Sequence, residues 1–194
     1  EIVMWLEFRR VLFRSAGGRG RGAAAVPPTA RTGAPIDLTG YWVAVITEDW
    51  RWRMLTPPKG DYASIPINAE GKRVADTWDP DRDQARGEQC RAYGAPGLMR
   101  GPTRLHITWQ GDNTLTLETD YGTQVRSLQF AGVTPPGAPT WQGVTKAEWV
   151  RAAVGRGGAG TRRGSLKTVT TRLRPGYLRK NGVPYSGNAV FTED

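Results

Sequence analysis

The sequence is poor in the residues that build disulfides, metal sites and histidine-based catalytic centres. Its 194 residues include one cysteine, Cys90, and one histidine, His106. A single cysteine excludes a disulfide within the chain, and one cysteine with one histidine is too few for a Cys/His zinc site. A Ser-His-Asp centre would depend on His106 alone. The sequence therefore predicts no metal and no cofactor.

Long hydrophobic runs and an extended basic face are also missing. No stretch of about 18 apolar residues is present, so no transmembrane helix is predicted. The formal net charge is +9, but the excess positive charge is localised in two Gly-rich segments, residues 16–22 and 155–164. A nucleic-acid footprint usually spreads over one face. Nucleic acid is therefore an unlikely partner, and the oligomeric state is not predictable.

The beginning of the chain does not look like part of the fold. Residues 6–15, LEFRRVLFRS, resemble a sequencing-library adapter translated in frame. We interpret residues 1–15 as a non-native scar, although apolar and arginine side chains over residues 2–14 imitate a basic membrane-surface helix. Residues 16–35 hold Gly, Ala, Arg and Pro with nothing large to bury, which predicts a disordered leader. A single domain is expected over residues 36–194.

The first part of that domain predicts a hairpin and then a helical excursion. Residues 41–47 are aromatic and β-branched, and residues 50–55 alternate Trp50, Trp52 and Met54 with arginine and leucine, which favours two strands. Asn68 can cap a helix that runs to about Trp78. Asp79-Pro80 has the cap-then-proline order that starts a second short helix.

The strongest β signal follows. Over residues 104–130, Leu105, Ile107 and Trp109 alternate with polar residues, and two Gly-containing turns separate three strands. Further strands are expected at residues 165–173 and from residue 188. The predicted fold class is mainly β, an antiparallel barrel or strongly curved sheet with a short helical excursion near residues 68–87.

Several segments together resemble a known family. The start DLTGYW at residues 37–42 is similar to the Gly-x-Trp start of lipocalin-like barrels and to the opening of a family of uncharacterised secreted proteins from soil bacteria. The C-terminal half of that family is matched by residues 141–143, 149, 166–171, 176–184 and 192–193.

The resemblance implies a lipocalin-like β architecture and a periplasmic or extracellular location, with a signal peptide lost by truncation. It implies no reaction. Residues 151–164 look like an insertion relative to the family, and the family usually continues beyond residues 192–193. A C-terminal truncation is therefore expected.

Four apparent motifs favour ordinary structural roles. Gly155-x-Gly157-x-x-Gly160 matches a dinucleotide fingerprint as a string but precedes a strand pattern, not a helix. Asp79-x-Asp81-x-Asp83 copies the start of a calcium loop, yet Gln84 and Cys90 stand where Gly and Glu are needed, which favours a solvated helix start. Cys90 is expected to be a small buried thiol and His106 a surface or hydrogen-bonded residue.

Tryptophan gives the best functional lead. The chain has eight, and they either fill the interior of the sheet or line a ligand site. We interpret Trp50 and Trp52, interleaved with Arg51 and Arg53, as the wall of a groove or barrel mouth that suits a flat apolar or anionic ligand. The predicted ligand-binding residues are Trp50, Trp52, Arg51, Arg53, Trp109 and Tyr121.

The predicted function is non-catalytic binding of a small apolar or amphipathic ligand. Two alternatives stay open. One is an extracellular hydrolase that uses carboxylates such as Asp49, Asp61 or Asp120, with Glu48 and Asp49 a poor pair because adjacent strand residues face opposite sides. The other is a polyanion or nucleic-acid binder that uses the Arg/Gly segments.

Overall fold

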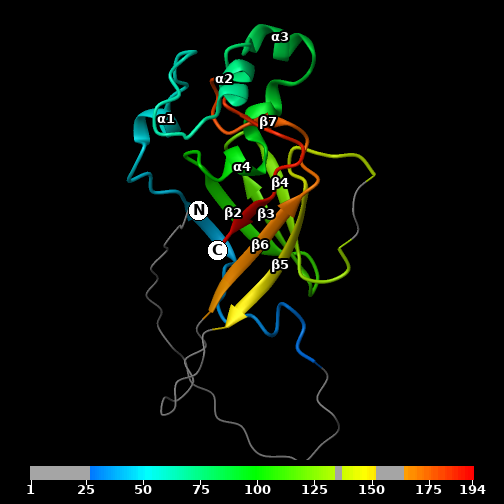
Figure 1. Cartoon of the computed structure of the whole chain (residues 1–194). Helices are drawn as coiled ribbons and strands as arrows, with labels where there is room; N and C mark the ends of the chain where they lie inside the picture. The colour runs from blue at the N-terminus through cyan, green and yellow to red at the C-terminus, as the bar shows by residue number, and fades with distance from the viewer. Residues whose placement is uncertain (1–26, 134–136, 152–163) are drawn as a thin grey trace, which may run out of the picture.

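One large β-sheet forms the body of the protein. The computed structural model describes residues 27–133, 137–151 and 164–194. Seven strands follow the spatial order β1-β2-β3-β4-β5-β6-β9 (Figure 1). They are β1 (Gly40–Val43), β2 (Arg104–Trp109), β3 (Thr114–Thr119), β4 (Gln124–Gln129), β5 (Val144–Arg151), β6 (Gly164–Thr171) and β9 (Phe191–Glu193).

Every pairing in this sheet is antiparallel except one. β4 and β5 run parallel and share two residue pairs, Leu128↔Thr145 and Gln129↔Lys146. The mainly β prediction, the three strands of residues 104–130 and the later strands are therefore confirmed. No closed barrel forms within the described residues, because β1 and β9 are the two edges of the sheet.

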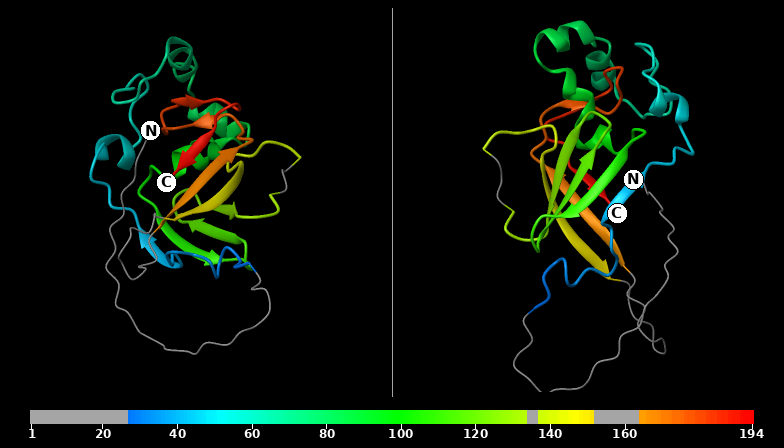
Figure 2. Two further views of the ribbon diagram at one scale, coloured as in Figure 1. Left: turned by 60° about the horizontal axis from the view of Figure 1, so that its bottom comes forward. Right: turned by 180° about the vertical axis from the view of Figure 1, so that it is seen from behind.

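The sheet is strongly curved, as Figure 2 shows. Arg126 on β4 donates two hydrogen bonds, of 3.1 and 2.7 Å, to the carboxylate of Glu193 on β9. Neighbouring strands lie about 4.8 Å apart, so β4 and β9 would be roughly 14 Å apart in a flat sheet. The direct contact between the two side chains requires the sheet to bend around them.

Alternation along the strands directs one set of side chains to the concave face. Buried Ile107, Leu115, Leu117, Leu128 and Ala147 form its apolar core. The register places Ile107 opposite Leu117 and Leu115 opposite Leu128. The same face carries the Arg126–Glu193 ion pair, to which Thr168 adds a 2.9 Å hydrogen bond on Glu193. The interior is therefore part apolar and part charged.

Short helices and a small hairpin cover one end of the sheet, at the top of Figure 1. Asn68 accepts a hydrogen bond from the N–H of Gly71, and Asp79 accepts one from Arg82, so both predicted N-caps are confirmed. The elements of this layer are α1 (Trp50–Met54), α2 (Ala69–Ala75), α3 (Pro80–Ala85), the 3-10 helix η1 (Gln89–Tyr93), α4 (Ala95–Leu98), β7 (Gly176–Tyr177) and β8 (Pro184–Tyr185).

The strand predicted at residues 50–55 is wrong, because Trp50–Met54 is the helix α1. Asp49 adopts a left-handed conformation with φ 50°, and its carbonyl accepts hydrogen bonds from the N–H groups of Trp52 and Arg53. The ladder between β1 and β2 ends at the pair Val43↔Arg104. The chain beyond it has no strand to pair with in the described residues, so it closes a helical turn instead.

The structure describes the last part of the predicted leader. Residues 29–33 form a turn that lies against the opposite end of the sheet from the helices (Figure 2). Arg31 donates its backbone N–H to the carbonyl of Asp112 at 3.0 Å. Residues 1–26 and most of the predicted insertion, including Gly155, Gly157 and Gly160, lie outside the described residues.

Candidate functional site

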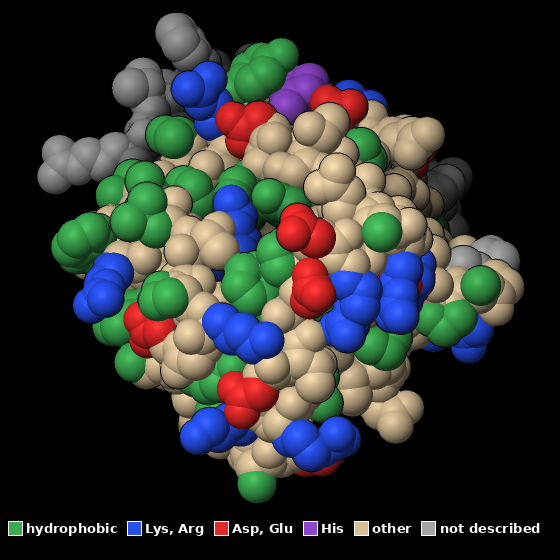
Figure 3. All heavy atoms as spheres, turned by 90° about the horizontal axis from the view of Figure 1, so that it is seen from above, with side chains coloured by type: hydrophobic (Ala, Val, Ile, Leu, Met, Phe, Trp, Pro, Cys, Tyr) green, Lys and Arg blue, Asp and Glu red, His purple; other side chains and the backbone are tan. Residues whose placement is uncertain are grey.

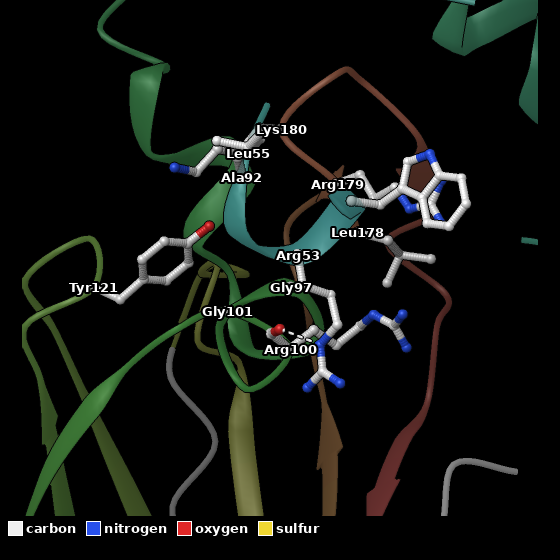
Figure 4. Close-up of a pocket in the computed structure, with 11 residues that line it drawn as sticks. Arg53, Leu55, Ala92, Gly97, Arg100, Gly101, Tyr121, Leu178, Arg179 and Lys180 are labelled. Atoms are coloured by element: carbon white, nitrogen blue, oxygen red, sulfur yellow. Dashed lines mark hydrogen bonds between the residues drawn. The ribbon is translucent and has the colours of Figure 1, made fainter. Parts of the chain in front are cut away.

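The structure brings together three of the six predicted ligand-binding residues. Trp52, Arg53 and Tyr121 line one pocket, which we call the basic pocket, together with Arg100, Arg179 and Lys180 (Figure 4). Trp50 and Arg51 do not line it. The Trp50 residue is 63% exposed, and the Arg51 side chain is 65% exposed.

The sixth predicted residue, Trp109, lies outside the basic pocket and belongs to a separate aromatic group. Its ring centroid is 5.6 Å from that of Phe130 and 6.5 Å from that of Trp149. The strand assumed for residues 50–55 had placed Trp50 and Trp52 on one face. On a helix, residues two apart point in different directions, and this separates them.

Segments far apart in the sequence form the basic pocket. α1 supplies Trp52 and Arg53, the chain after α4 supplies Arg100, the loop after β3 supplies Tyr121, and the loop after β7 supplies Arg179 and Lys180. The cavity is about 20 Å³. A space of this size holds one or two water-sized groups, not a whole drug-sized molecule.

Tertiary contacts fix α1 against the pocket. The indole N–H of Trp52 donates to Asp61 Oδ2 at 3.1 Å, and Arg53 Nε donates to the carbonyl of Arg100 at 2.7 Å. Across the pocket, Gly101 gives room to the ring of Tyr121, because a Cβ at Gly101 would lie 2.3 Å from that ring. The helix and the phenol therefore form fixed walls.

Positive charge dominates the lining. Arg53 is 4.0 Å from Glu48, and Arg100 is 3.6 Å from Asp49. Neither Arg179 nor Lys180 forms an ion pair with a carboxylate in the described ranges. The Lys180 ammonium instead lies 4.8 Å from the ring centroid of Tyr121. The pocket thus holds more cationic groups than nearby carboxylates.

Arg179 is the most deeply placed of these cations. It is 5% exposed, its Nη2 donates to Ser64 Oγ at 2.8 Å, and its guanidinium carbon lies 5.4 Å from the ring centroid of Trp52. Its Nη1 is buried and has no hydrogen-bond partner in the described structure. Burial first, and then Arg100, lower the pKa values of both Arg53 and Arg179. A negative charge in the pocket would oppose both effects.

The carboxylates proposed for hydrolysis each have a basic or hydrogen-bonding partner. Asp49 is bound to Arg100, Asp61 to the Trp52 indole, and Asp120 accepts the backbone N–H of Arg104 at 2.8 Å. Glu48 lies beside Arg53. Each is held by an arginine or by another donor, as structural carboxylates are.

The remaining motif residues have structural partners. His106 Nδ1 lies 2.8 Å from Glu118 Oε2, and its ring stacks on Tyr41 at a centroid distance of 4.3 Å. Cys90 is a free, half-buried thiol in η1. Asp83 corrects the expectation of a solvated helix start, because it is 4% exposed and accepts a 2.7 Å hydrogen bond from the Tyr177 hydroxyl. No cluster of three His, Cys, Asp or Glu side chains in the described ranges fits a metal ion.

The sequence-based search missed Arg100, Arg179 and Lys180. Arg179 and Lys180 entered only as part of residues 176–184 of the family resemblance, and Arg100 lies in a Gly/Pro-rich stretch without periodicity. One signal was present, because Arg179 and Lys180 are adjacent cations with no acidic neighbour within ten residues in either direction.

Comparisons with known proteins do not assign the site. No protein-family model matches the chain, and no curated protein and no solved structure is significantly similar to it. The resemblance to the secreted family therefore stays a prediction. Among the helices of the described residues, none has the length and hydrophobicity needed to span a bilayer.

Proposed function

We propose that the protein binds a small amphipathic anion without catalysis, and that the basic pocket holds the anionic group. The observation that carries the proposal is the buried Arg179, whose Nη1 has no partner in the described structure. Leaving a buried donor unpaired costs about 1–3 kcal/mol, and more when the group is charged. Arg179 lines the pocket, so a carboxylate or phosphate bound there would supply a countercharge for its buried guanidinium.

The shape of the pocket limits how such a ligand binds. A cavity of about 20 Å³ takes the anionic group alone, so the apolar remainder must lie at the rim. Leu55 lines the pocket and is 63% exposed, and Tyr121 offers a flat ring beside it. Figure 3 shows basic and hydrophobic side chains interspersed over this helical end of the molecule. The surface therefore suits a ligand with one charged and one apolar part.

Calorimetric titration with octanoate and with octanol tests the proposal, because the two probes share an alkyl chain and differ in charge. We expect octanoate to bind and octanol to bind at least roughly tenfold more weakly. Affinity for octanoate should fall as salt is added, since exposed electrostatic attraction is screened. Equal affinity for both probes would contradict an anion site.

Matched variants locate the binding. Arg100→Gln and Lys180→Gln each remove one cation from the lining and should weaken octanoate binding by roughly three- to tenfold. Arg73→Gln is the control, because its side chain is 69% exposed on α2 and pairs only with Glu70 in the described structure. If Arg73→Gln weakens binding as much as the two pocket variants, the attraction comes from overall charge and not from this pocket.

A further inference from the structure

A second hollow lies at the opposite end of the sheet from the basic pocket. Its cavity is about 390 Å³. Phe130, Ala147 and Trp149 of the sheet form one side of it, and Pro28, Thr29 and Ala30 form the other. Ligand pockets for drug-sized molecules begin at about 300 Å³. The hollow is therefore large enough for a whole small molecule, unlike the basic pocket.

Aromatic rings from β2, from β5 and from the residue just after β4 meet on the sheet side. Phe130 lies 5.2 Å from Trp149 and 5.6 Å from Trp109 between ring centroids. The rings are tilted by 31° and 35° relative to each other in these two pairs. All three are half-buried, so the group is packed enough to be rigid and still presents apolar ring surface.

Residues 28–33, which contain the turn described above, form the facing wall of the hollow. We call them the N-terminal turn, and hydrogen bonds hold them to the rest of the fold. Asn113 Oδ1 accepts the backbone N–H of Ala30 at 3.1 Å, and the indole N–H of Trp149 donates to the carbonyl of Ala30 at 2.8 Å. Arg151 donates to the carbonyl of Gly33, also at 2.8 Å. The wall is therefore held to the rest of the fold at Ala30 and at Gly33.

These same bonds define what the hollow can recognise. Asn113 Oδ1, the indole N–H of Trp149 and one guanidinium nitrogen of Arg151 are already engaged with the N-terminal turn. The charged residues on its lining are one acid and one base, Glu148 and Arg151. The lining has no excess charge, so it complements a neutral ligand through ring and aliphatic contacts.

From this geometry we propose that the hollow is a second binding site, which takes a neutral small molecule with a flat apolar ring system. The ring lies between the N-terminal turn and the faces of Phe130 and Trp149. The site is independent of the basic pocket, which differs from it in residues, charge and end of the sheet. Either proposal can therefore fail while the other holds.

The neutral fluorescent probe N-phenylnaphthylamine tests this site. We expect its emission to rise and shift to the blue on binding, and excitation of tryptophan to be transferred to it. Phe130→Leu keeps an aliphatic side chain but removes the ring, and it should weaken the probe roughly tenfold. Trp50→Leu is the control, because Trp50 lines neither pocket and is 63% exposed, and it should leave probe affinity unchanged.

A filling variant keeps the test valid if Phe130→Leu fails to fold. Ala30→Trp adds a large side chain from the N-terminal turn, and it should abolish probe binding while far-UV circular dichroism stays as in the parent. Octanoate should still bind this variant. The proposal is overturned if the probe does not bind, if Ala30→Trp binds it as the parent does, or if Trp50→Leu weakens it as much as Phe130→Leu.

Discussion

The two ends of the sheet offer a ligand opposite environments. The helical end has a cavity of about 20 Å³ lined by Arg53, Arg100, Arg179 and Lys180, whereas the far end has about 390 Å³ beside Phe130 and Trp149. Loops and short helices build the first, and strand ends with one tethered turn build the second. One sheet thus carries a small basic pocket at one end and a larger, open hollow with aromatic rings at the other.

The largest expected effect comes from the scaffold that both ends share. Arg126→Ala leaves the carboxylate of Glu193 without its partner inside the sheet, and breaking such a pair costs about 3 kcal/mol or more. Urea unfolding should show this loss, and both binding activities should fall together. The double variant Arg126→Met with Glu193→Leu should recover much of the stability. If the double variant is no more stable than Arg126→Ala, the ion pair is not the cause.

A change confined to the helical end comes next. Gly101→Ala places a methyl group 2.3 Å from the Tyr121 ring, and such overpacking costs about 1–3 kcal/mol. We expect octanoate binding to weaken and N-phenylnaphthylamine binding to persist, measured on samples confirmed as folded by circular dichroism. Equal loss of both ligands would show that the two ends are coupled.

Alkaline pH should also act on the helical end. Burial raises the pKa of Tyr185 to about 12. The folded-state pKa of Tyr185 lies above the unfolded value near 10. The contribution of the neutral Tyr185 to the free energy of unfolding is therefore complete below pH 10 and is lost as the pH rises from about 10 to 12. The Tyr185 hydroxyl has no partner in the described structure, so Tyr185→Phe should add about 1 kcal/mol. Urea unfolding at pH 8 and pH 11 would show a smaller alkaline loss in this variant, and an unchanged loss would contradict the assignment.

A smaller effect is expected at the far end. Asn113→Ala removes the acceptor for the Ala30 N–H, and because the bond is exposed we expect about 0.5 kcal/mol of destabilisation. Probe affinity should fall as the N-terminal turn loosens, while octanoate affinity stays the same. Calorimetry with both ligands measures this, and a fall in octanoate affinity would be the contradicting result.

The smallest effect is expected at Arg51, which the sequence analysis predicted to bind the ligand. The Arg51 side chain is 65% exposed and lies 3.9 Å from Asp61, and exposed pairs contribute about 0–1 kcal/mol. Arg51→Ala should therefore change stability by less than about 0.5 kcal/mol and octanoate affinity by less than about twofold. A larger loss of octanoate affinity would show that α1 contributes its outer face to the site.

The strands between residues 104 and 130 could be predicted from the sequence because alternation and turn residues determine them locally. Between residues 104 and 130 the apolar alternation is regular, and Gly111 and Gly122 supply the positive φ angles, 71° and 73°, that the two turns need. Asn68 and Asp79 likewise accept hydrogen bonds from backbone N–H groups three residues further along the chain. In each case the interaction that decides the structure lies within a few residues.

Residues 50–55 could not be predicted from local sequence patterns. The alternation of Trp and Arg fits a strand, yet the contacts that hold α1 come from Asp61 and Arg100. The basic pocket has the same character, because Arg53 and Arg179 are more than a hundred residues apart and meet only through the fold. Tryptophan content led to Trp52 and Trp109, but no local pattern shows that they occupy different ends.

The single parallel pairing has a consequence for how the protein folds. β1 to β4 and β5 with β6 and β9 are two sets of antiparallel strands, whose backbones pair with each other at two residue pairs between β4 and β5. The hairpins β2–β3 and β3–β4 form from close neighbours in sequence and should assemble early, whereas the parallel junction must wait for the chain between Phe130 and Gly143 to close. Amide hydrogens at Leu128 and Thr145 should therefore exchange with solvent sooner than those within β3, because partial opening of the sheet begins where the two sets meet.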